Sequence, residues 1–298
     1  MFANFKPTVE LWKQEPGVDG MLKHIERCGR VSYKSESCIT NDSYNEFVNR
    51  MLVNHHLSVL EHGSVYLKIP VKAETSYRID SYIDNPYSKA RINQESDGWY
   101  YYISTNYRVL VEHSWVNDLK YLCEPTEYHE KRYTLHIITD RGVSAEGNRH
   151  RKNSITERST RYCDYSGGKF DGQVRVMVPN EFSDYDHIEF LEHINEDRST
   201  GTGMLQSLCG MIASGVELQE FESWLLANLA CEYSYHRLRK LGWTSQQARR
   251  VLPFDLETEV AYTAFKSDWE HFLELRCNKL AHPDMQVIAN KIKETLNL

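Results

Sequence analysis

The residues best suited to chemistry in this sequence form one basic stretch, RHRKNSITERSTRY, at positions 149–162. It holds four arginines, one lysine and a single acid, Glu157, within a chain whose formal net charge is -7. An arginine in a cleft needs an anion beside it, because an unpaired buried charge is strongly destabilising. Each charge-assisted hydrogen bond to a phosphate contributes roughly 1.5–3 kcal/mol. The stretch therefore predicts a site for an anionic ligand.

The same stretch could also form a charged helix face. If residues 149–162 were helical, five polar residues would share one face: Arg151, Ser154, Glu157, Arg158 and Arg161. A solvent-exposed helix can carry such a charged face, but it needs about three apolar residues per two turns to pack against the rest of the protein. The only aliphatic residue in this stretch is Ile155. The anion site is therefore favoured. The chain has no GxxxxGK[ST] or GxGxxG loop, so arginine side chains would have to hold a nucleotide.

Histidines and cysteines offer weaker signals. The segment HHLSVLEH, residues 55–62, carries three histidines, but its spacing differs from HExxH. We therefore expect no metal site and a packing role for His55. The seven cysteines are scattered and form no CxxC pair, which is typical of reduced thiols in a cytoplasmic protein.

The whole chain sets broad limits on the fold and on partners. With 298 residues and 41% hydrophobic content, it can bury a core as one large domain or two small ones. It has no apolar run of about 18 residues, which predicts no membrane span. The N-terminal segment MFANFKPTVELWKQEPG lacks the apolar region of a secretory signal. The acidic net charge argues against a general nucleic-acid-binding protein.

The elements that must position the basic stretch are predicted from hydrophobic periodicity. Alternating apolar residues predict strands over residues 64–71, 133–140 and 172–179. Helical spacing predicts helices over residues 44–53 and 217–241, a helix or broken helix over 256–280, and a last helix from Pro283 onward. Gly242 would end the second helix, and Thr244 with Gln247 would form a capping box. Because strands and helices do not alternate regularly, we predict an α+β or mixed α/β fold.

The basic stretch resembles the signature of the flavin-dependent thymidylate synthases, in which RHR is followed by a serine, here Ser159. Other blocks resemble this family in the same order: GRVSYKS (29–35), HHLSVLEH (55–62), DRGVSAEGNRHR (140–151), STRYCDYS (159–166), WTSQQARRVLP (243–253) and HFLELR (271–276). The resemblance touches most of the chain and is weakest at residues 73–100 and 180–220. Because several blocks occur in order, the match is more specific than RHR alone.

The resemblance implies a single domain over residues 1–298, with a central, mainly antiparallel sheet flanked by long helices and a family-variable segment at residues 73–132. It implies reductive methylation of dUMP to dTMP, with methylenetetrahydrofolate as carbon donor, FAD as cofactor and NADPH as reductant of the flavin. It further implies a cytoplasmic homotetramer whose active sites combine several subunits, with no nucleic-acid or membrane partner.

The resemblance also implies which residues form the site. The implied dUMP contacts are Glu146, Arg149, Glu157, Arg158, Ser159, Thr160, Arg161, Arg249 and Arg276. The implied FAD contacts are Ser58, Arg149, His150, Arg151, Glu157 and His271, with His56 on the folate or flavin side. Since dUMP, FAD and folate are all anionic, arginines in a shaped cleft suit them.

Arg276, in FLELR, is the implied catalytic residue. Cysteine-dependent synthases activate uracil with a thiolate next to a proline, but no cysteine here follows a proline. The flavin-dependent family polarises the ring with an arginine, which stays protonated and stabilises charge rather than acting as a base. A helix-end salt bridge is the alternative role for Arg276. Ser159 has no adjacent base and is expected to bind or orient the substrate. Gly147-Asn148 replaces bulkier residues, which predicts a looser helix start at RHR.

Two other functions stay open at this point. A non-catalytic RNA- or nucleotide-binding protein could use the arginines together with nearby tyrosines, and its binding would depend strongly on salt. A metal-dependent nucleotide hydrolase could use the histidines, and chelators would inhibit it. A flavin absorption spectrum distinguishes the synthase from both.

Overall fold

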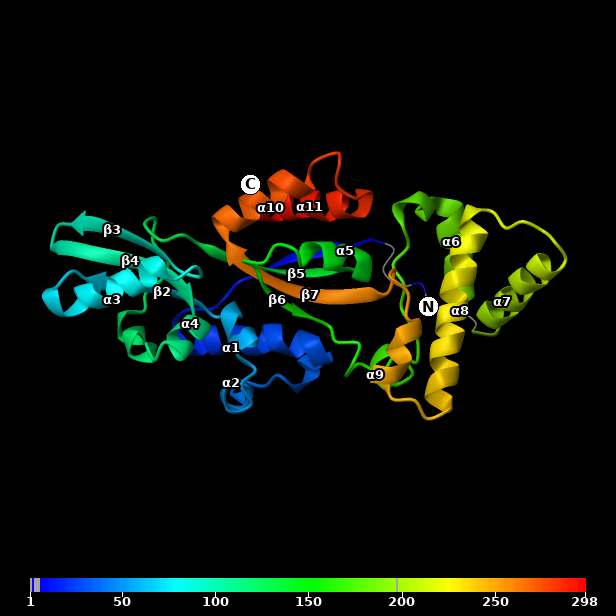
Figure 1. Cartoon of the computed structure of the whole chain (residues 1–298), viewed down its shortest axis with the longest axis horizontal. Coiled ribbons are helices and arrows are strands. Elements are labelled where there is room, and N and C mark those ends of the chain that lie inside the picture. Colours follow the sequence, from blue (N-terminus) through cyan, green and yellow to red (C-terminus); the bar gives the residue numbers. More distant parts are fainter. Residues whose placement is uncertain (1, 3–5, 197) are drawn as a thin grey trace.

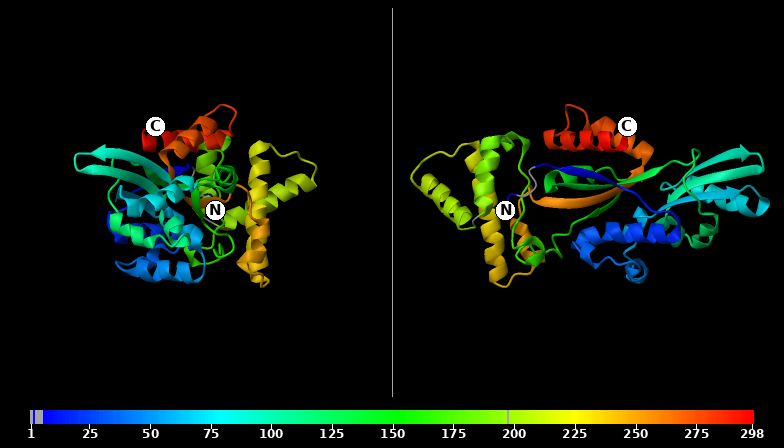
Figure 2. Two further views of the ribbon diagram at one scale, coloured as in Figure 1. Left: turned by 60° about the vertical axis from the view of Figure 1, so that its left-hand side comes forward. Right: turned by 180° about the vertical axis from the view of Figure 1, so that it is seen from behind.

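The protein is elongated, with three parts in a row along its longest axis (Figure 1). The computed structural model describes residue 2, residues 6–196 and residues 198–298, with residues 73–77, 196 and 198 described by their backbone alone. A four-stranded sheet lies in the middle, a three-stranded sheet at one end and a group of helices at the other, and the view from behind gives the same order (Figure 2). Among the described residues, no helix combines the length and the apolar character needed to cross a membrane.

The central sheet is antiparallel and has the strand order β1-β5-β7-β6. Its strands are β1 (Thr8–Trp12), β5 (Arg132–Asp140), β7 (Glu257–Phe265) and β6 (Ser154–Glu157). Successive side chains of a strand point to opposite faces. In β7, Tyr262 therefore faces helices α10 (Lys266–Arg276) and α11 (Pro283–Leu296), whereas Thr263 faces helix α1 (Gly17–Arg30). We call these two sides the α11 face and the α1 face.

The α11 face is apolar. Helices α10, α11 and α5 (Arg141–Gly147) cover it (Figure 1). The larger buried side chains of this core are Leu135, Ile137, Val143, Val260, Tyr262, Trp269, Phe272, Leu273, Met285, Ile288 and Ile292. Each side chain of this kind stabilises the fold by about 1.5–3 kcal/mol when it is fully buried, so apolar packing holds the two C-terminal helices on the sheet.

The α1 face is polar although it is buried. The segments on this side are α1, α2 (Ser43–Val53) and the 3₁₀ helices η1 (Val31–Tyr33), η2 (Glu36–Cys38) and η3 (Leu57–His62). The buried polar side chains here are His24, His62, Thr134, Ser154, Thr156, Arg158, Glu257 and Thr263. Buried polar groups need hydrogen-bond partners, so this face depends on specific pairing more than on apolar area.

The second sheet is antiparallel, with the order β2-β4-β3. It consists of β2 (Ser64–Pro70), β4 (Gly98–Asn106) and β3 (Lys89–Glu95), accompanied by α3 (Ala73–Asp84), α4 (Tyr107–Glu112) and η4 (Val116–Tyr121). Its apolar residues share one core with α1 and α2: Met21, Ile25, Phe47, Leu60, Val65, Leu67, Ile79, Ile103 and Leu110. The segment at residues 73–132 therefore extends the fold without a separate core.

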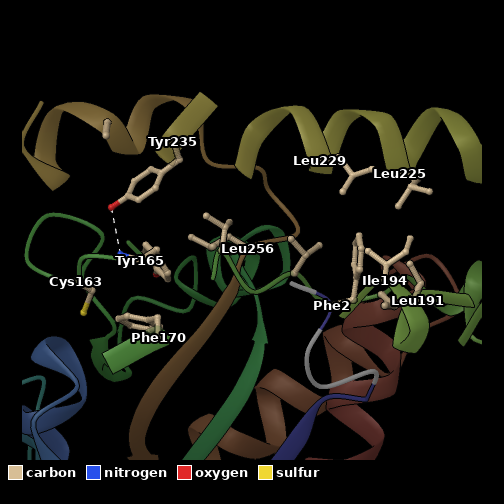
Figure 3. Packing of buried hydrophobic residues seen from close by; sticks show 14 of the residues in the cluster. Phe2, Cys163, Tyr165, Phe170, Leu191, Ile194, Leu225, Leu229, Tyr235 and Leu256 are labelled. Carbon is tan, nitrogen blue, oxygen red and sulfur yellow. Dashed lines mark hydrogen bonds between the residues drawn. The ribbon is translucent and has the colours of Figure 1, made fainter. Parts of the chain in front are cut away.

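The other end is helical. It contains α6 (Tyr185–Glu196), α7 (Arg198–Ala213), α8 (Glu220–Lys240) and α9 (Ser245–Ala248), with the 3₁₀ helices η5 (Gly168–Phe170), η6 (Asn180–Phe182) and η7 (Arg249–Val251). Leu225 and Leu229 of α8 point toward Phe2, Leu191 and Ile194 (Figure 3). Farther along α8, the hydroxyl of Tyr235 accepts a hydrogen bond of 3.3 Å from the backbone N–H of Tyr165 (Figure 3). The chain that follows β6 is thereby held against α8.

Most predicted elements are confirmed. The strands predicted at residues 64–71 and 133–140 are β2 and β5, and the helices predicted at 44–53, at 217–241 and from Pro283 are α2, α8 and α11. Gly242 follows α8 with a φ of 91°, and the Thr244–Gln247 capping box is present. The α+β fold with a central antiparallel sheet is also confirmed. That the chain is one domain stays a prediction.

Two element predictions are wrong. The first half of the helix or broken helix predicted over residues 256–280 is instead β7, because ETEVAYTAF is buried on both faces of a central strand and its β-branched residues suit that position. The second half is confirmed as α10. The strand predicted over residues 172–179 is irregular: Val176 makes only isolated bridges to Phe2 and Leu256. The buried side chains of Val174 and Val176 explain the alternating pattern, since this segment packs on the helical end rather than within a sheet.

Candidate active site

The basic stretch is not a helix. Helix α5 ends at Gly147, turns follow, and residues 154–157 form β6, which pairs with β7. Serine and threonine are weak interior helix formers, and Ser154 and Thr156 find hydrogen-bond partners on the α1 face instead. The looser helix start predicted at RHR is therefore wrong. A side chain at Gly147 would place its Cβ 2.4 Å from Tyr262 Oη, so glycine permits this close approach.

Arg276 bonds to two of the other predicted site residues, Glu146 and His150. Its Nη1 donates to the Glu146 carboxylate and its Nη2 to the Glu146 carbonyl oxygen, both at 2.9 Å. Its Nε donates to His150 Nε2 at 3.1 Å. Burial lowers the pKa of His150 to about 4, with the charge of Arg276 adding to the effect, so the imidazole is neutral and accepts this bond. The His271 ring lies 6.4 Å from that of His150.

Glu157 lies on the α11 face of β6 and is held from three sides. Its carboxylate accepts hydrogen bonds from Ser144 Oγ at 2.8 Å and from Thr258 Oγ1 at 3.0 Å. Arg141 forms an ion pair with it at 3.2 Å and also donates to the carbonyl oxygen of Arg158. The carboxylate therefore has a fixed orientation beside α5.

Arg158 points the other way, into the α1 face. Its side chain is fully buried and forms ion pairs with Glu257, at 3.1 Å, and with Glu259. Burial alone would raise the pKa of Glu259, but the nearby His136 imidazole, 3.9 Å away, and the charge of Arg158 outweigh it and hold this pKa at about 2. Protein carboxylates therefore supply the anions that Arg158 needs, and its predicted contact with dUMP stays a prediction.

The residues after β6 lie near α9. The backbone N–H of Ser159 donates to the carbonyl oxygen of Ser32 at 2.9 Å, which ties the stretch to η1. Arg161 Nε donates to Gln246 Oε1 of α9 at 3.2 Å. Thr160 is half-buried, and Arg249 follows α9 on an exposed turn of η7. The structure thus brings Arg161 to the segment that carries Arg249.

Three predicted arginines remain open to a ligand. Arg149, Arg151 and Arg249 are exposed, and none of them forms an ion pair with another residue that the structure describes. Arg149 and Glu146 line a cavity of about 510 Å³ between α5 and the start of α11. Other residues of its wall are Asp140, Gly142, Met177, Asn180, Phe254, His282 and Asp284. Burial raises the pKa values of Asp140 and Asp284.

The predicted contacts on η3 lie apart from Arg276. His56 and Ser58 are exposed and belong to the side of the α1 face, whereas Arg276 and Glu146 belong to the α11 side. Glu61 of the same segment pairs with Arg108 at 2.6 Å. The described chain therefore gathers the predicted residues into separate groups rather than one pocket. In the described residues, no three His, Cys, Asp or Glu side chains lie together as a metal site requires.

Sequence reasoning missed the residues that hold the stretch in place. Arg141 is the first residue of α5, the helix that leads to RHR. Its place between an acid and a glycine in the sequence is only a weak indication that it pairs with Glu157. Glu257 and Glu259 alternate at the start of β7, where helical spacing predicts a helix. In a strand, both acids lie on one face, where Arg158 pairs with them.

Comparisons with known proteins bear on this site. The sequence matches the family model described as thymidylate synthase complementing protein over residues 101–297. A comparison with curated proteins finds no match. Among solved structures, ThyX of Helicobacter pylori with FAD and dUMP is 15% identical, with a TM-score of 0.41 over 97% of this chain and 92% of that one. The UMP/dUMP methylase PolB of Streptomyces cacaoi bound with 5-Br dUMP is 14% identical, with a TM-score of 0.40 over 99% and 92%.

The family model covers more than half of the chain, including β5, the basic stretch, β7 and α10. This confirms the family predicted from RHRKNSITERSTRY and its flanking blocks. The chain belongs to the thymidylate synthase complementing protein family, the flavin-dependent thymidylate synthases.

Proposed function

We propose that this chain catalyses the reductive methylation of dUMP to dTMP, with methylenetetrahydrofolate as carbon donor, FAD as cofactor and NADPH as reductant. One contrast carries the proposal: Arg158 is neutralised inside the protein, whereas Arg149 and Arg151 are exposed without an ion pair to any described residue. Exposed guanidinium groups, of which that of Arg149 lines a cavity, suit the phosphates of dUMP and FAD, which they can bind with two parallel hydrogen bonds.

The predicted roles divide along the basic stretch. We assign flavin binding to three groups of side chains: Arg149, His150 and Arg151 before β6, Ser58 on η3, and His271 on α10. His56, directly before η3, is assigned to the folate or flavin side. We assign dUMP binding to Glu146, Glu157, Ser159, Thr160, Arg161 and Arg249. Because its guanidinium is held by Glu257 and Glu259, we propose that Arg158 contributes to the dUMP site through its backbone and supports the loop that begins at Ser159.

Arg276 is the proposed electrostatic stabiliser. Bound FAD in its reduced form supplies the hydride. As negative charge develops on the uracil ring, the Arg276 guanidinium would stabilise it, and Glu146 and His150 already hold this group in one orientation. Since His150 is neutral and accepts from Arg276 through Nε2, its proton is on Nδ1. A neutral imidazole adds no repulsion to the neighbouring guanidinium.

We also propose that the enzyme is a homotetramer with shared sites. His56 and Ser58 lie on the opposite side of the central sheet from Arg276, so other copies of the chain would have to complete each site. Light scattering coupled to size-exclusion chromatography should give the mass of four chains. A monomer that turns over dUMP at its full rate would contradict the shared site.

The activity can be tested with the purified chain and added FAD. We expect a flavin absorption spectrum and release of tritium from dUMP labelled at carbon 5, provided that methylenetetrahydrofolate and NADPH are both present. Omitting the folate or the NADPH serves as the control for each co-substrate. A protein that binds no FAD and releases no tritium would overturn the proposal.

A further inference from the structure

The two motif segments predicted to contact flavin meet on the α1 face of β6. One is the basic stretch, whose strand β6 turns Ser154 and Thr156 inward. The other is η3, which carries Ser58 and ends at His62. Two buried side chains connect these segments, and neither is a predicted ligand contact.

The first connection is His62. Its Nε2 is 2.9 Å from Thr156 Oγ1 of β6, and its Nδ1 is 2.7 Å from Thr263 Oγ1 of β7. The ring is completely buried, and burial lowers the pKa of His62 well below its usual value. The imidazole is therefore neutral, and its two nitrogens bridge two hydroxyl groups as one donor and one acceptor.

The second connection is Arg132, at the start of β5. Its Nη2 donates to the carbonyl oxygen of Glu61 at 3.0 Å and to Ser154 Oγ at 3.2 Å. Its Nη1 donates to Ser64 Oγ at 3.3 Å. One guanidinium group thus reaches both η3 and β6.

Arg132 is costly to keep in this position. It is buried, burial lowers its pKa to about 10, and it forms no ion pair with any residue in the described part of the chain. A buried charge without a counter-ion lowers the stability of a fold. Since burying Arg132 lowers the stability of the fold, its position is better explained by its bonds to Glu61 and Ser154, which fix the distance between η3 and β6.

We infer that His62 and Arg132 are positioning residues that hold β6 against η3 and so keep a constant spacing between Ser58 and the RHR turn. This inference rests on the proposed function, because in a site shared between copies each chain presents Ser58 and the RHR turn to bound flavin, and the spacing between them sets where the flavin contacts lie. The two residues act through Thr156, Ser154 and the backbone of Glu61, without touching a ligand themselves.

Thr156→Val tests the inference, because valine keeps the shape of threonine and removes only the hydroxyl that His62 needs. We expect the Kd for FAD to rise about tenfold, equivalent to about 1.4 kcal/mol. The matched control is Thr134→Val. Thr134 is equally buried and bonds to Thr263 and His24 in the same network, but it touches neither motif segment. We expect a similar loss of thermal stability in both variants and weaker FAD binding only in Thr156→Val.

Substitutions of His62 give a second, independent test. The glutamine amide in His62→Gln can still donate to one hydroxyl and accept from the other, whereas His62→Leu can do neither. We expect His62→Gln to restore most of the FAD affinity that His62→Leu loses. Equal FAD affinity in the wild type, Thr156→Val and His62→Leu would overturn the inference alone. A wild-type chain that binds no FAD would overturn the proposed function first.

Discussion

Arg276 and Glu146 are joined twice, since the guanidinium donates to both the carboxylate and the backbone carbonyl oxygen of Glu146, each at 2.9 Å. Arg276 is the last residue of α10, and Glu146 lies in the last turn of α5, just before RHR. A helix-end salt bridge and an electrostatic catalyst were alternative roles for this arginine. The geometry allows both, because the salt bridge orients the group that would stabilise the substrate.

Replacing Arg276 should separate catalysis from flavin binding. For Arg276→Ala we expect kcat to fall by about 10²–10³-fold, because a preorganised donor is lost, while the Kd for FAD changes little. Tritium release and flavin titration measure the two quantities. Arg239→Ala is the control, since it removes another ion-paired arginine, bound to Asp164 at 2.6 Å in the helical end. If Arg276→Ala turns over as fast as Arg239→Ala, Arg276 does not stabilise the transition state.

Arg158 should matter for stability more than for catalysis. Arg158→Met leaves Glu257 and Glu259 without their buried counter-ion, so we expect the free energy of unfolding to fall by about 3–5 kcal/mol. Adding Glu257→Gln and Glu259→Gln should restore much of the loss, because no uncompensated charge then remains. Urea denaturation measures all of these variants. If Arg158→Met unfolds at the wild-type midpoint, the buried ion pairs do not stabilise the fold.

The contact between Gly147 and Tyr262 predicts a pair of coupled variants. Gly147→Ala would place a methyl group 2.4 Å from Tyr262 Oη, so we expect a loss of about 1–3 kcal/mol from overpacking. In a Tyr262→Phe background the nearest atom is gone, and the same alanine should cost less. A double-mutant cycle measured by thermal unfolding tests this coupling. Strictly additive effects would show that the two residues do not press on each other.

Acid should destabilise the protein through its buried histidines. Burial lowers the pKa of His24 from 6.5 to about 3, and the charges of Arg27 and Arg132 add to the effect. Stability is therefore complete above the unfolded-state pKa and declines as the pH falls, because the unfolded chain takes up a proton that the native chain refuses. We expect Tm to fall as the pH drops from 6.5 toward about 3. The slope should be smaller in His24→Gln, and an unchanged slope would contradict this account.

Much of the architecture could be predicted from local sequence. Short stretches of sequence were enough to predict the capping box at Thr244, the end of α8 at Gly242 and the strands β2 and β5, because neighbouring residues determine each of these features. The strand β7 could not be predicted in this way. It is buried on both faces, so it carries no alternation between apolar and polar residues. Val260 and Trp269 have helical spacing, but they belong to two different elements, β7 and α10.

The sequence predicts the residue types of the candidate site, but not how these residues divide between the two faces of the central sheet. The sequence places Glu157 and Arg158 side by side, and nothing local indicates that they serve opposite faces of the central sheet. That division follows once β6 is known to be a strand. Glu157 bonds to Thr258 and Arg158 bonds to Glu257, and these two β7 residues lie on opposite faces of the sheet. Pairing between strands far apart in the chain decided it.

The four residues of β6 also have a consequence for how this family can diverge. Ile155 and Glu157 face the α11 side, whereas Ser154 and Thr156 face His62 and Arg132. Alternate positions of this short strand thus pack against different parts of the protein, so substitutions on one face need not affect the other. Among relatives, residues at positions 154 and 156 should therefore covary with those at 62 and 132, and position 157 should vary independently of them.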